Sequence, residues 1–296
     1  MMASNPVTLM LQAICRDPAD RLAWLALADA QEEMGQEHGA RLTRLREQLR
    51  FLSPGDHRRR HLEQQLQKLL AQGVVPVMPS WTGKTPHGVS MTFHLIPPGT
   101  FRMGSPVDAL HRQSADPLES EQSVERPFWI ARTLLSHAQA KTGSSPHPVP
   151  LPYEAPLIDQ LSQHWNLPLR WPTEREWEYA CRAATTSRYH GGEAECVPLV
   201  AWCAYGDPGQ RSLKTKPVAH FVPNAWGLYD MHGNLWEWLS TRRQGGILTA
   251  GGCFRAIPQR CTATARMVCR DGQLRDIVGG RLAFDWSPEE LPIPCE

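Results

Sequence analysis

The sequence is poor in lysine and carries almost no net charge. Of its 31 basic residues only five are Lys, and the formal net charge at pH 7 is +1. Such a balance gives no reason to expect nucleic acid or an anionic membrane as a partner. No apolar run approaches the roughly 20 residues of a membrane-spanning helix. The N-terminus also lacks the basic start and small-residue cleavage site of a signal peptide. We therefore expect no nucleic acid partner and no membrane insertion.

The sequence also lacks the signature of a small disulfide-stapled secreted domain. Its eight cysteines are spread over 296 residues, and cysteines in a long chain without a signal are more often reduced and buried. We expect that state, with one disulfide as the alternative. Apolar residues at 41% and charged residues at 21% are ordinary for a protein with a sizeable core. Eleven Trp residues favour a rigid, loop-rich fold held by aromatic anchors.

Residues 1–75 are expected to form a small helical domain. Asp17 and Pro18 are typical of a helix start, as the N-cap and the first helical position. The basic run HRRRH at 57–61 is either a solvated helix start or a contact for an anionic partner. Leucines three or four residues apart predict one apolar stripe per helix, at Leu22 and Leu25, at Leu42, Leu45, Leu49 and Leu52, and at Leu62, Leu66 and Leu69.

The pattern changes after a predicted linker at 76–89. Short alternating stretches, Gly/Pro turns and scattered Trp predict an irregular α+β domain over 90–296. Alternation followed by a turn in SMTFHLIPPGTFRMGS (90–105) indicates a β-hairpin. Thr173, with Glu176 three residues later, indicates a helix that starts with a capping box.

Four stretches of this second domain, in the same order, resemble one known family. The family is the formylglycine-generating enzyme superfamily, whose members share a C-type-lectin-like fold, and the resemblance covers roughly 90 to 286. It implies an α+β, C-type-lectin-like domain behind the helical one. The four stretches are IPPGTFRMGS (96–105), WPTEREWEYACRAA (171–184), NAWGLYDMHGNLWEW (224–238) and GGCFR…GGRLAF (251–284).

The third of these stretches contains a candidate calcium site. Asp230 and Glu237 flank a turn, and with the carbonyls of Gly233 and Leu235 they could offer hard oxygen ligands to Ca²⁺. The resemblance implies calcium at the equivalent positions. The alternative is that both acids accept backbone N–H groups of the turn. We therefore expect a structural calcium at most, and no cofactor that the protein requires.

The fourth stretch lacks the catalytic metal site that the resemblance would imply. The oxidases of the family bind copper through two cysteines separated by four residues, and thiolates suit Cu(I) because both are soft. Aligned on the paired glycines, the second position is Cys261, but the first is Ala256. Cys253 and Cys269 are each eight positions from Cys261 and do not restore the spacing. The family's sulfoxide synthases hold iron with a histidine cluster, and the helical region offers only His38, His57 and His61, without that spacing. We predict that the protein is not an enzyme.

The superfamily also contains the variable proteins of diversity-generating retroelements, which this chain resembles most. In them a C-terminal segment between GG and GFRLA is diversified to bind varied ligands. This chain has GGCFR and VGGRLAF, with Gly280 where Phe is usual, and Pro258, Cys261 and Arg266 match fixed scaffold positions. The resemblance implies a macromolecular ligand, and a protein that is cytoplasmic or associated with a phage particle. The predicted ligand-binding positions are Arg255, Ala256, Ile257, Arg260, Thr262, Val268, Cys269, Leu274 and Ile277.

Two alternatives stay open beside the binding protein. One is a sulfatase-maturing oxidase that uses Cys261, and the other is a degenerate structural module of the superfamily. Under each of these functions we expect buried aromatic anchors at Trp177, Trp226, Trp236 and Trp238.

Overall fold

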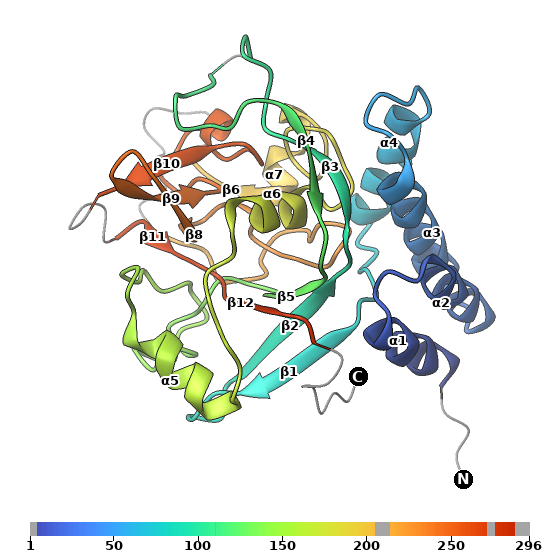
Figure 1. Cartoon of the computed structure of the whole chain (residues 1–296), viewed down its shortest axis with the longest axis horizontal. Helices are drawn as coiled ribbons and strands as arrows, with labels where there is room; N and C mark the ends of the chain where they lie inside the picture. The colour runs from blue at the N-terminus through green and yellow to red at the C-terminus, as the bar shows by residue number, and fades with distance from the viewer. Residues whose placement is uncertain (1–4, 110, 205–213, 271–275, 288–296) are drawn as a thin grey trace.

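A computed structural model of the chain describes residues 5–109, 111–204, 214–270 and 276–287. Four helices come first and lie together along one side of a mixed part built from short strands, turns and three further helices (Figure 1). The predicted α+β class with preceding helices is confirmed. The helices are α1 (Pro6–Arg16), α2 (Arg21–Glu33), α3 (Glu37–Phe51), α4 (Arg59–Ala71), α5 (Pro156–Trp165), α6 (Glu174–Arg182) and α7 (Val197–Val200).

The start of α2 differs from the predicted one. Asp20, not Asp17, is the N-cap, and its side chain accepts a hydrogen bond from the Leu22 amide at 2.8 Å. Asp17 instead ends α1, and its carboxylate accepts from the Ala19 amide at 3.0 Å, so Pro18 lies in the turn between the two helices. Both acids can cap an N–H group two residues ahead. The local sequence therefore did not distinguish them.

The helices and the mixed part share one hydrophobic core. Leu49 of α3 and Leu66 of α4 belong to the same buried cluster as Trp177 of the mixed part. Buried arginines also cross this boundary: the Arg50 guanidinium donates to the Pro98 carbonyl at 3.0 Å, and that of Arg59 to the Ala184 carbonyl at 2.6 Å. Such donors satisfy carbonyls that would otherwise be buried without partners.

The strands form two four-stranded sheets and two small two-stranded ones. The first large sheet has the order β1 (Ser80–Lys84), β2 (Ser90–Ile96), β5 (Phe128–Ala131), β12 (Ala283–Asp285). The second has the order β10 (Arg266–Cys269), β9 (Gly246–Ala250), β8 (Trp236–Arg243), β11 (Val278–Gly279). The small sheets pair β3 (Gly99–Met103) with β4 (Ser120–Val124), and β6 (Ala201–Trp202) with β7 (His232–Gly233).

Two predictions about this region are wrong. The stretch 76–89, predicted as a linker, contains β1, which pairs antiparallel with β2 at the edge of the first sheet. The hairpin predicted over 90–105 does not form, because β2 pairs with β1 and β5 while β3 pairs with β4. Between β2 and β3 lie Pro97 and Pro98, which have no amide hydrogen to donate to a ladder.

Helix α6 lies at the centre of the mixed part, where it contacts strands of two sheets. The predicted capping box is confirmed: the Thr173 side chain accepts from the Glu176 amide, and the Glu176 carboxylate accepts from the Thr173 amide. The helix packs against β3 and β4 on one side and against β8 and β9 of the second sheet on another (Figure 1). The predicted anchors are also confirmed, since Trp177 and Trp226 are 0% exposed and Trp236 and Trp238 4% and 7%.

Among the described residues, no helix is both long enough and apolar enough to cross a membrane.

Candidate ligand-binding surface

The segment 251–284 leaves strand β9 through two glycines whose backbone only glycine adopts easily. Gly251 and Gly252 have φ of +88° and +82°. A Cβ on Gly252 would lie 2.4 Å from the Arg260 carbonyl oxygen, so the chain passes too close for any side chain. After an irregular loop, β10 returns antiparallel to β9. The loop between the glycines and β10 is thereby held at both ends by the second sheet.

The described positions predicted to bind ligand divide into an exposed and a buried group. Arg255 and Ile257 are exposed, and Ala256, Arg260 and Val268 are partly exposed. Thr262, Cys269 and Ile277 are buried, at 8%, 2% and 9% exposure. Leu274 lies outside the described residues.

Cys269 and Ile277 therefore do not lie on a surface, contrary to the prediction. Cys269 is the last residue of β10, opposite Ile247 of β9, and both belong to the second hydrophobic cluster. Ile277 belongs to the same cluster, and its carbonyl accepts from the Trp236 amide at 2.9 Å. The strands here are only two to four residues long, too short for an alternating pattern to separate an inner from an outer face.

Arg260 is partly exposed but already engaged by the protein. Its guanidinium donates to both carboxylate oxygens of Asp116, at 3.0 and 3.1 Å, and to the Arg266 carbonyl. It also lies over the Trp236 ring, 5.8 Å from the centroid. Arg260 thus fixes the loop onto the rest of the fold. The most exposed stretch is 255–259, where Arg255, Ile257 and Gln259 are exposed and Arg255 pairs with the exposed Asp276.

A polar pocket of about 420 Å³ lies beside this stretch. Gln259, Thr262 and Thr264 contribute from the C-terminal segment, and the loop after β3 and the chain after α6 supply the rest. Hydroxyl, guanidinium and carboxylate groups predominate, together with the His111 imidazole, so the pocket suits a ligand that hydrogen-bonds. The other lining residues are Gly104, Ser105, Pro106, Asp108, Ala109, His111, Arg112, Asp116, Glu119, Arg182, Thr186, Ser187 and Arg188.

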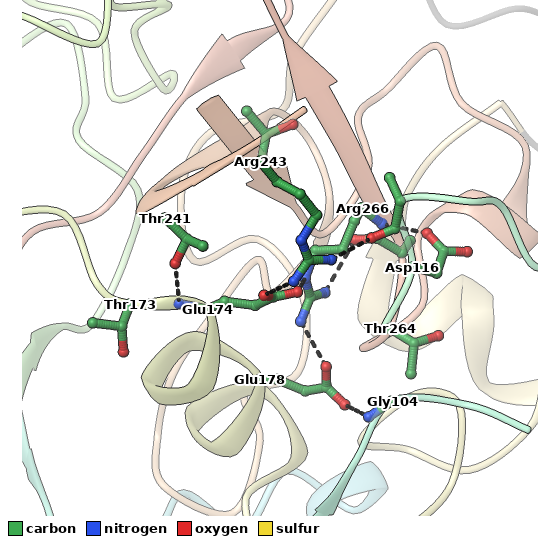
Figure 2. A network of polar contacts seen from close by, with 12 residues as sticks. Gly104, Asp116, Thr173, Glu174, Glu178, Thr241, Arg243, Thr264 and Arg266 are labelled. Atoms are coloured by element: carbon green, nitrogen blue, oxygen red, sulfur yellow. Dashed lines mark hydrogen bonds and ion pairs between the residues drawn. The ribbon is translucent and has the colours of Figure 1, made fainter. Parts of the chain in front are cut away.

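A buried network of charges supports both the pocket and the loop. Arg266 is 0% exposed; its guanidinium donates to Glu178 at 2.6 Å and to Glu174 at 3.2 Å, both on α6. Its backbone amide donates to Asp116 at 2.8 Å. Figure 2 shows these contacts converging on the Arg266 side chain between the helix and the second sheet. The role of Arg266 as a fixed scaffold residue stays a prediction, and its contacts support it.

The same network reaches strand β8 and the loop that lines the pocket. Arg243 at the end of β8 donates to the second carboxylate oxygen of Glu174 at 2.7 Å. The Gly104 amide, at the start of the pocket's loop, donates to Glu178 at 2.7 Å (Figure 2). Because each buried carboxylate has several donors, the network holds its parts in one arrangement. The pocket is therefore built on a rigid base.

The predicted calcium site has a different set of contacts. Glu237, in β8, accepts from Arg281 with both carboxylate oxygens, at 2.7 and 2.8 Å, and both residues are buried. A guanidinium thus occupies the place where Glu237 would meet a cation. Gly233 and Leu235 lie in the buried turn ahead of it, and no group of three or more His, Cys, Asp or Glu among the described residues could hold a metal ion. Calcium stays a prediction that this arrangement does not favour.

Asp230 is left with an unsatisfied oxygen. Its Oδ2 accepts from the Ala219 amide at 2.8 Å, while Oδ1 is buried without a partner. Burial raises the pKa of this carboxyl from 3.8 to about 6, and the nearby charge of Glu237 also raises it.

The raised pKa of Asp230 predicts a specific pH dependence for Asp230→Asn. The folded state holds the proton more tightly than the unfolded state, so the stability linked to it is present below about pH 4 and is lost as pH rises to about 6. Asn keeps the acceptor for Ala219 without a charge and tolerates the positive φ of 57°. We expect the variant to be more stable than the parent at pH 7.5, by up to about 3 kcal/mol, and equal to it near pH 4. Urea titrations at several pH values measure this.

Repeating the titrations with EDTA separates this account from a calcium site. A bound ion would stabilise the folded parent by mass action, and Asp230→Asn would then lose stability at neutral pH. We expect the chelator to change neither curve. A variant less stable than the parent at pH 7.5, with a parent that EDTA destabilises, would contradict the expectation and identify a calcium ligand.

The cysteines of the region are buried, apart from the partly exposed Cys196. Cys181, Cys196, Cys203, Cys253, Cys261 and Cys269 form no disulfide, whereas Cys15 is disulfide-bonded. Cys261 is 0% exposed, and burial raises the pKa of its thiol well above the usual range. The methyl group of Ala256 offers no metal ligand. The two-cysteine copper site of the resembled oxidases therefore does not fit residues 256 and 261.

Two residues that the sequence analysis missed contact the predicted segment. Asp116 binds Arg260 and Arg266 from 144 and 150 positions away in the chain. Cys203 belongs to the same small buried cluster as Cys261. No local spacing could have revealed either contact.

Residues 140–286 match the family model described as "Sulfatase-modifying factor enzyme 1-like domain". The formylglycine-generating enzyme of Mycobacterium tuberculosis is 41% identical over 80 residues, which are 24% of this chain and 27% of that protein. The inactive C-alpha-formylglycine-generating enzyme 2 of Bos taurus is 28% identical over 127 residues, 39% of this chain and 42% of that protein. The chain thus spans about a quarter to two fifths of these relatives.

The fold is also that of a variable protein. The structure of Treponema denticola variable protein 1 matches with a TM-score of 0.59 and 18% sequence identity, covering 70% of this chain and 99% of that one. At this identity the match establishes the fold alone. The match to the family model confirms the resemblance to the formylglycine-generating enzyme superfamily, and the likeness to a variable protein is one of fold.

Proposed function

We propose that the region 140–286, which matches the sulfatase-modifying factor enzyme 1-like domain model, binds a macromolecular ligand and performs no catalysis. The observation that carries the proposal is the state of the would-be catalytic segment. Position 256 is an alanine, and the one thiol at the family's positions, Cys261, is wholly buried. A copper-activating centre needs two thiolate ligands that oxygen and substrate can approach.

The exposed surface of the segment also supports a binding role. The stretch 255–259 presents a guanidinium, an aliphatic side chain and an amide side by side, and it borders the polar pocket. Interfaces gain affinity from a few such anchors on a well-ordered base. The network around Arg266 provides that base, because it ties the loop to α6 and β8.

The alternative function, a sulfatase-maturing oxidase, would form a product that can be assayed. We expect no formylglycine when the protein is incubated with a sulfatase-type cysteine peptide, Cu(I) and oxygen, because Ala256 supplies no second thiolate. Mass spectrometry of the peptide checks this, with an active formylglycine-generating enzyme as positive control. Product that forms with this chain and disappears in Cys261→Ser would replace the binding proposal with the oxidase.

The finer proposal is that a retroelement diversifies the segment. Mutation of adenines in AAC or AAT codons leaves codons of the form NNY, which never encode Lys, Glu, Gln, Met, Trp or a stop. The exposed Arg255 and Ile257 belong to the reachable set. Gln259, Met267 and Gln273 do not, so we propose that the template fixes them; Gln273 lies outside the described residues.

Sequencing the gene and its neighbourhood tests this origin. We expect codons that end in C or T at most of the remaining predicted positions, and a nearby near-copy of the 251–284 coding segment with adenines opposite them. These positions are Arg255, Ala256, Ile257, Arg260, Thr262, Val268 and Leu274. Codons ending in purines, or a neighbourhood without a near-copy, would leave an ordinary degenerate relative. Cys269 and Ile277 are buried, so their codons should match the template.

A further inference from the structure

Two thiols from distant parts of the chain meet behind the exposed stretch. Cys203 directly follows β6, and Cys261 ends the loop that carries residues 255–259. They are 4% and 0% exposed and belong to one small apolar cluster. Neither the family model nor the sequence pattern assigns Cys203 a role.

The backbone on both sides holds the two thiols in place. The Ala204 amide, next to Cys203, donates to the Ala256 carbonyl at 2.8 Å. On the other side, the carbonyl of Cys261 contacts Nδ1 of His232 at 2.8 Å. His232 pairs with Ala201 in the two-stranded sheet that ends just before Cys203. Both cysteines are thus tied to the same strand pair, and their proximity does not depend on a flexible side chain.

The surroundings of the pair favour a neutral product over a charged one. The cluster consists of Tyr189, Val197, Val200 and Ala201 with the two cysteines, and Ala256 packs against it. A metal held by two thiolates would place negative charge in this apolar site, where an uncompensated charge is costly. A disulfide carries no charge and removes two buried thiol groups.

We propose that Cys203 and Cys261 form a disulfide when a hydroperoxide oxidises the protein. The thiolate of Cys203 attacks one peroxide oxygen, the O–O bond breaks, and hydroxide leaves, so that Cys203 becomes a sulfenic acid. The sulfur of Cys261 then attacks the Cys203 sulfur and displaces water. In sum, two thiols and one hydrogen peroxide give one disulfide and two waters.

The two thiols are not equivalent, which sets the order of these steps. Cys203 is 4% exposed, whereas Cys261 is 0% exposed. A peroxide therefore reaches Cys203 first, and Cys261 is the resolving thiol.

The disulfide would fix the base of the exposed stretch. Residues 255–259 lie between the glycine turn and Cys261, and their only covalent anchors are the two ends of the loop. A bond from Cys261 to Cys203 adds an anchor from a separate strand pair, and such pre-organisation increases affinity by lowering the ordering cost. This consequence rests on the proposed binding function, whereas the oxidation itself does not.

Peptide mapping of the whole protein tests the oxidation. The full chain is treated with hydrogen peroxide, its remaining thiols are blocked, and it is digested with trypsin. Cleavage after Arg260 and Arg266 gives a peptide whose one cysteine is Cys261, while the peptide 189–211 contains Cys196 and Cys203. We expect a cross-link between these two peptides, which persists in Cys196→Ser and is lost in Cys203→Ser. The melting temperature of the oxidised parent should rise by about 5–10 °C, reversibly with reductant.

Three outcomes would overturn the proposal. In the first, the peptides that contain Cys203 and Cys261 stay unlinked although other thiols of the protein are oxidised. In the second, the link survives in Cys203→Ser and disappears in Cys196→Ser. In the third, an anaerobic Cu(I) titration shows one ion bound through both cysteines and protecting them from peroxide, which would assign the pair to a metal. The cross-link is read from the parent protein, so it remains interpretable if a variant folds poorly. If the cross-link forms but ligand binding does not change, the oxidation stands and only its proposed effect on affinity is contradicted.

Discussion

Replacing Arg266 with Met should lower the free energy of unfolding by about 3–5 kcal/mol. The guanidinium is fully buried and donates to Glu174, Glu178 and the carbonyls of Ala263 and Ala265. Met has a similar size but no hydrogen-bond donor, so the buried carboxylates of Glu174 and Glu178 each lose a hydrogen-bond partner. Urea unfolding, followed by tryptophan fluorescence, measures the loss.

The matched control is Arg255→Met, because Arg255 is exposed and pairs with the exposed Asp276. Exposed ion pairs contribute little, so this variant should change stability by less than about 1 kcal/mol. Adding Glu178→Gln to Arg266→Met should recover part of the loss, since the stranded charge is then removed. Equal losses for the two arginine variants would contradict the buried network.

Replacing Trp226 with Ala should cost a similar amount, about 3–5 kcal/mol, for a different reason. Its ring is 0% exposed and lies 4.6 Å from the Tyr179 ring, centroid to centroid. It belongs to the cluster shared by the helices and the mixed part, so the cavity would loosen both. We expect one cooperative transition at a lower denaturant concentration, measured by circular dichroism for the helices and by fluorescence for the mixed part.

Phe51→Ala is the matched control for an aromatic outside the core. Phe51 is 53% exposed and contacts mainly the guanidinium groups of Arg21 and Arg50. Its loss should cost less than about 1 kcal/mol. Two separate transitions in Trp226→Ala would show that the helices and the mixed part do not share a cooperative core.

Much of the scaffold could be predicted because its determinants are local or compositional. The capping box at Thr173 needs only a hydroxyl and a carboxyl three residues apart, and it forms as predicted. The four tryptophans are buried as expected, because such large rings lose most by facing water. The glycine pair at 251 and 252 has the positive φ angles of a turn. The errors arose where neighbouring signals competed, as at Asp17 and Asp20.

The candidate surface could be predicted only in part. The position of the loop and the exposure of Arg255 and Ile257 agree with the prediction, but Cys269 and Ile277 are buried. Exposure in irregular segments depends on which distant elements cover each side chain, and short strands carry too little pattern to show it. The pocket itself was not predictable, because its walls come from the loop after β3, the chain after α6 and the C-terminal segment.

The sequence by itself determined the capping box of α6, the aromatic anchors, the superfamily fold and the lack of a second thiol at position 256. Each of these depends on residue identities within a few positions, or on motifs in a recognisable order. Only the tertiary structure decided that Asp116 would bind Arg260 and Arg266, and that Cys203 would lie beside Cys261. These contacts join residues between 58 and about 150 positions apart. Hydrogen bonds and packing contacts act only over short distances, so they form after the fold has brought the two residues together. The course of the backbone therefore decides which residues become partners, and the local sequence pattern does not.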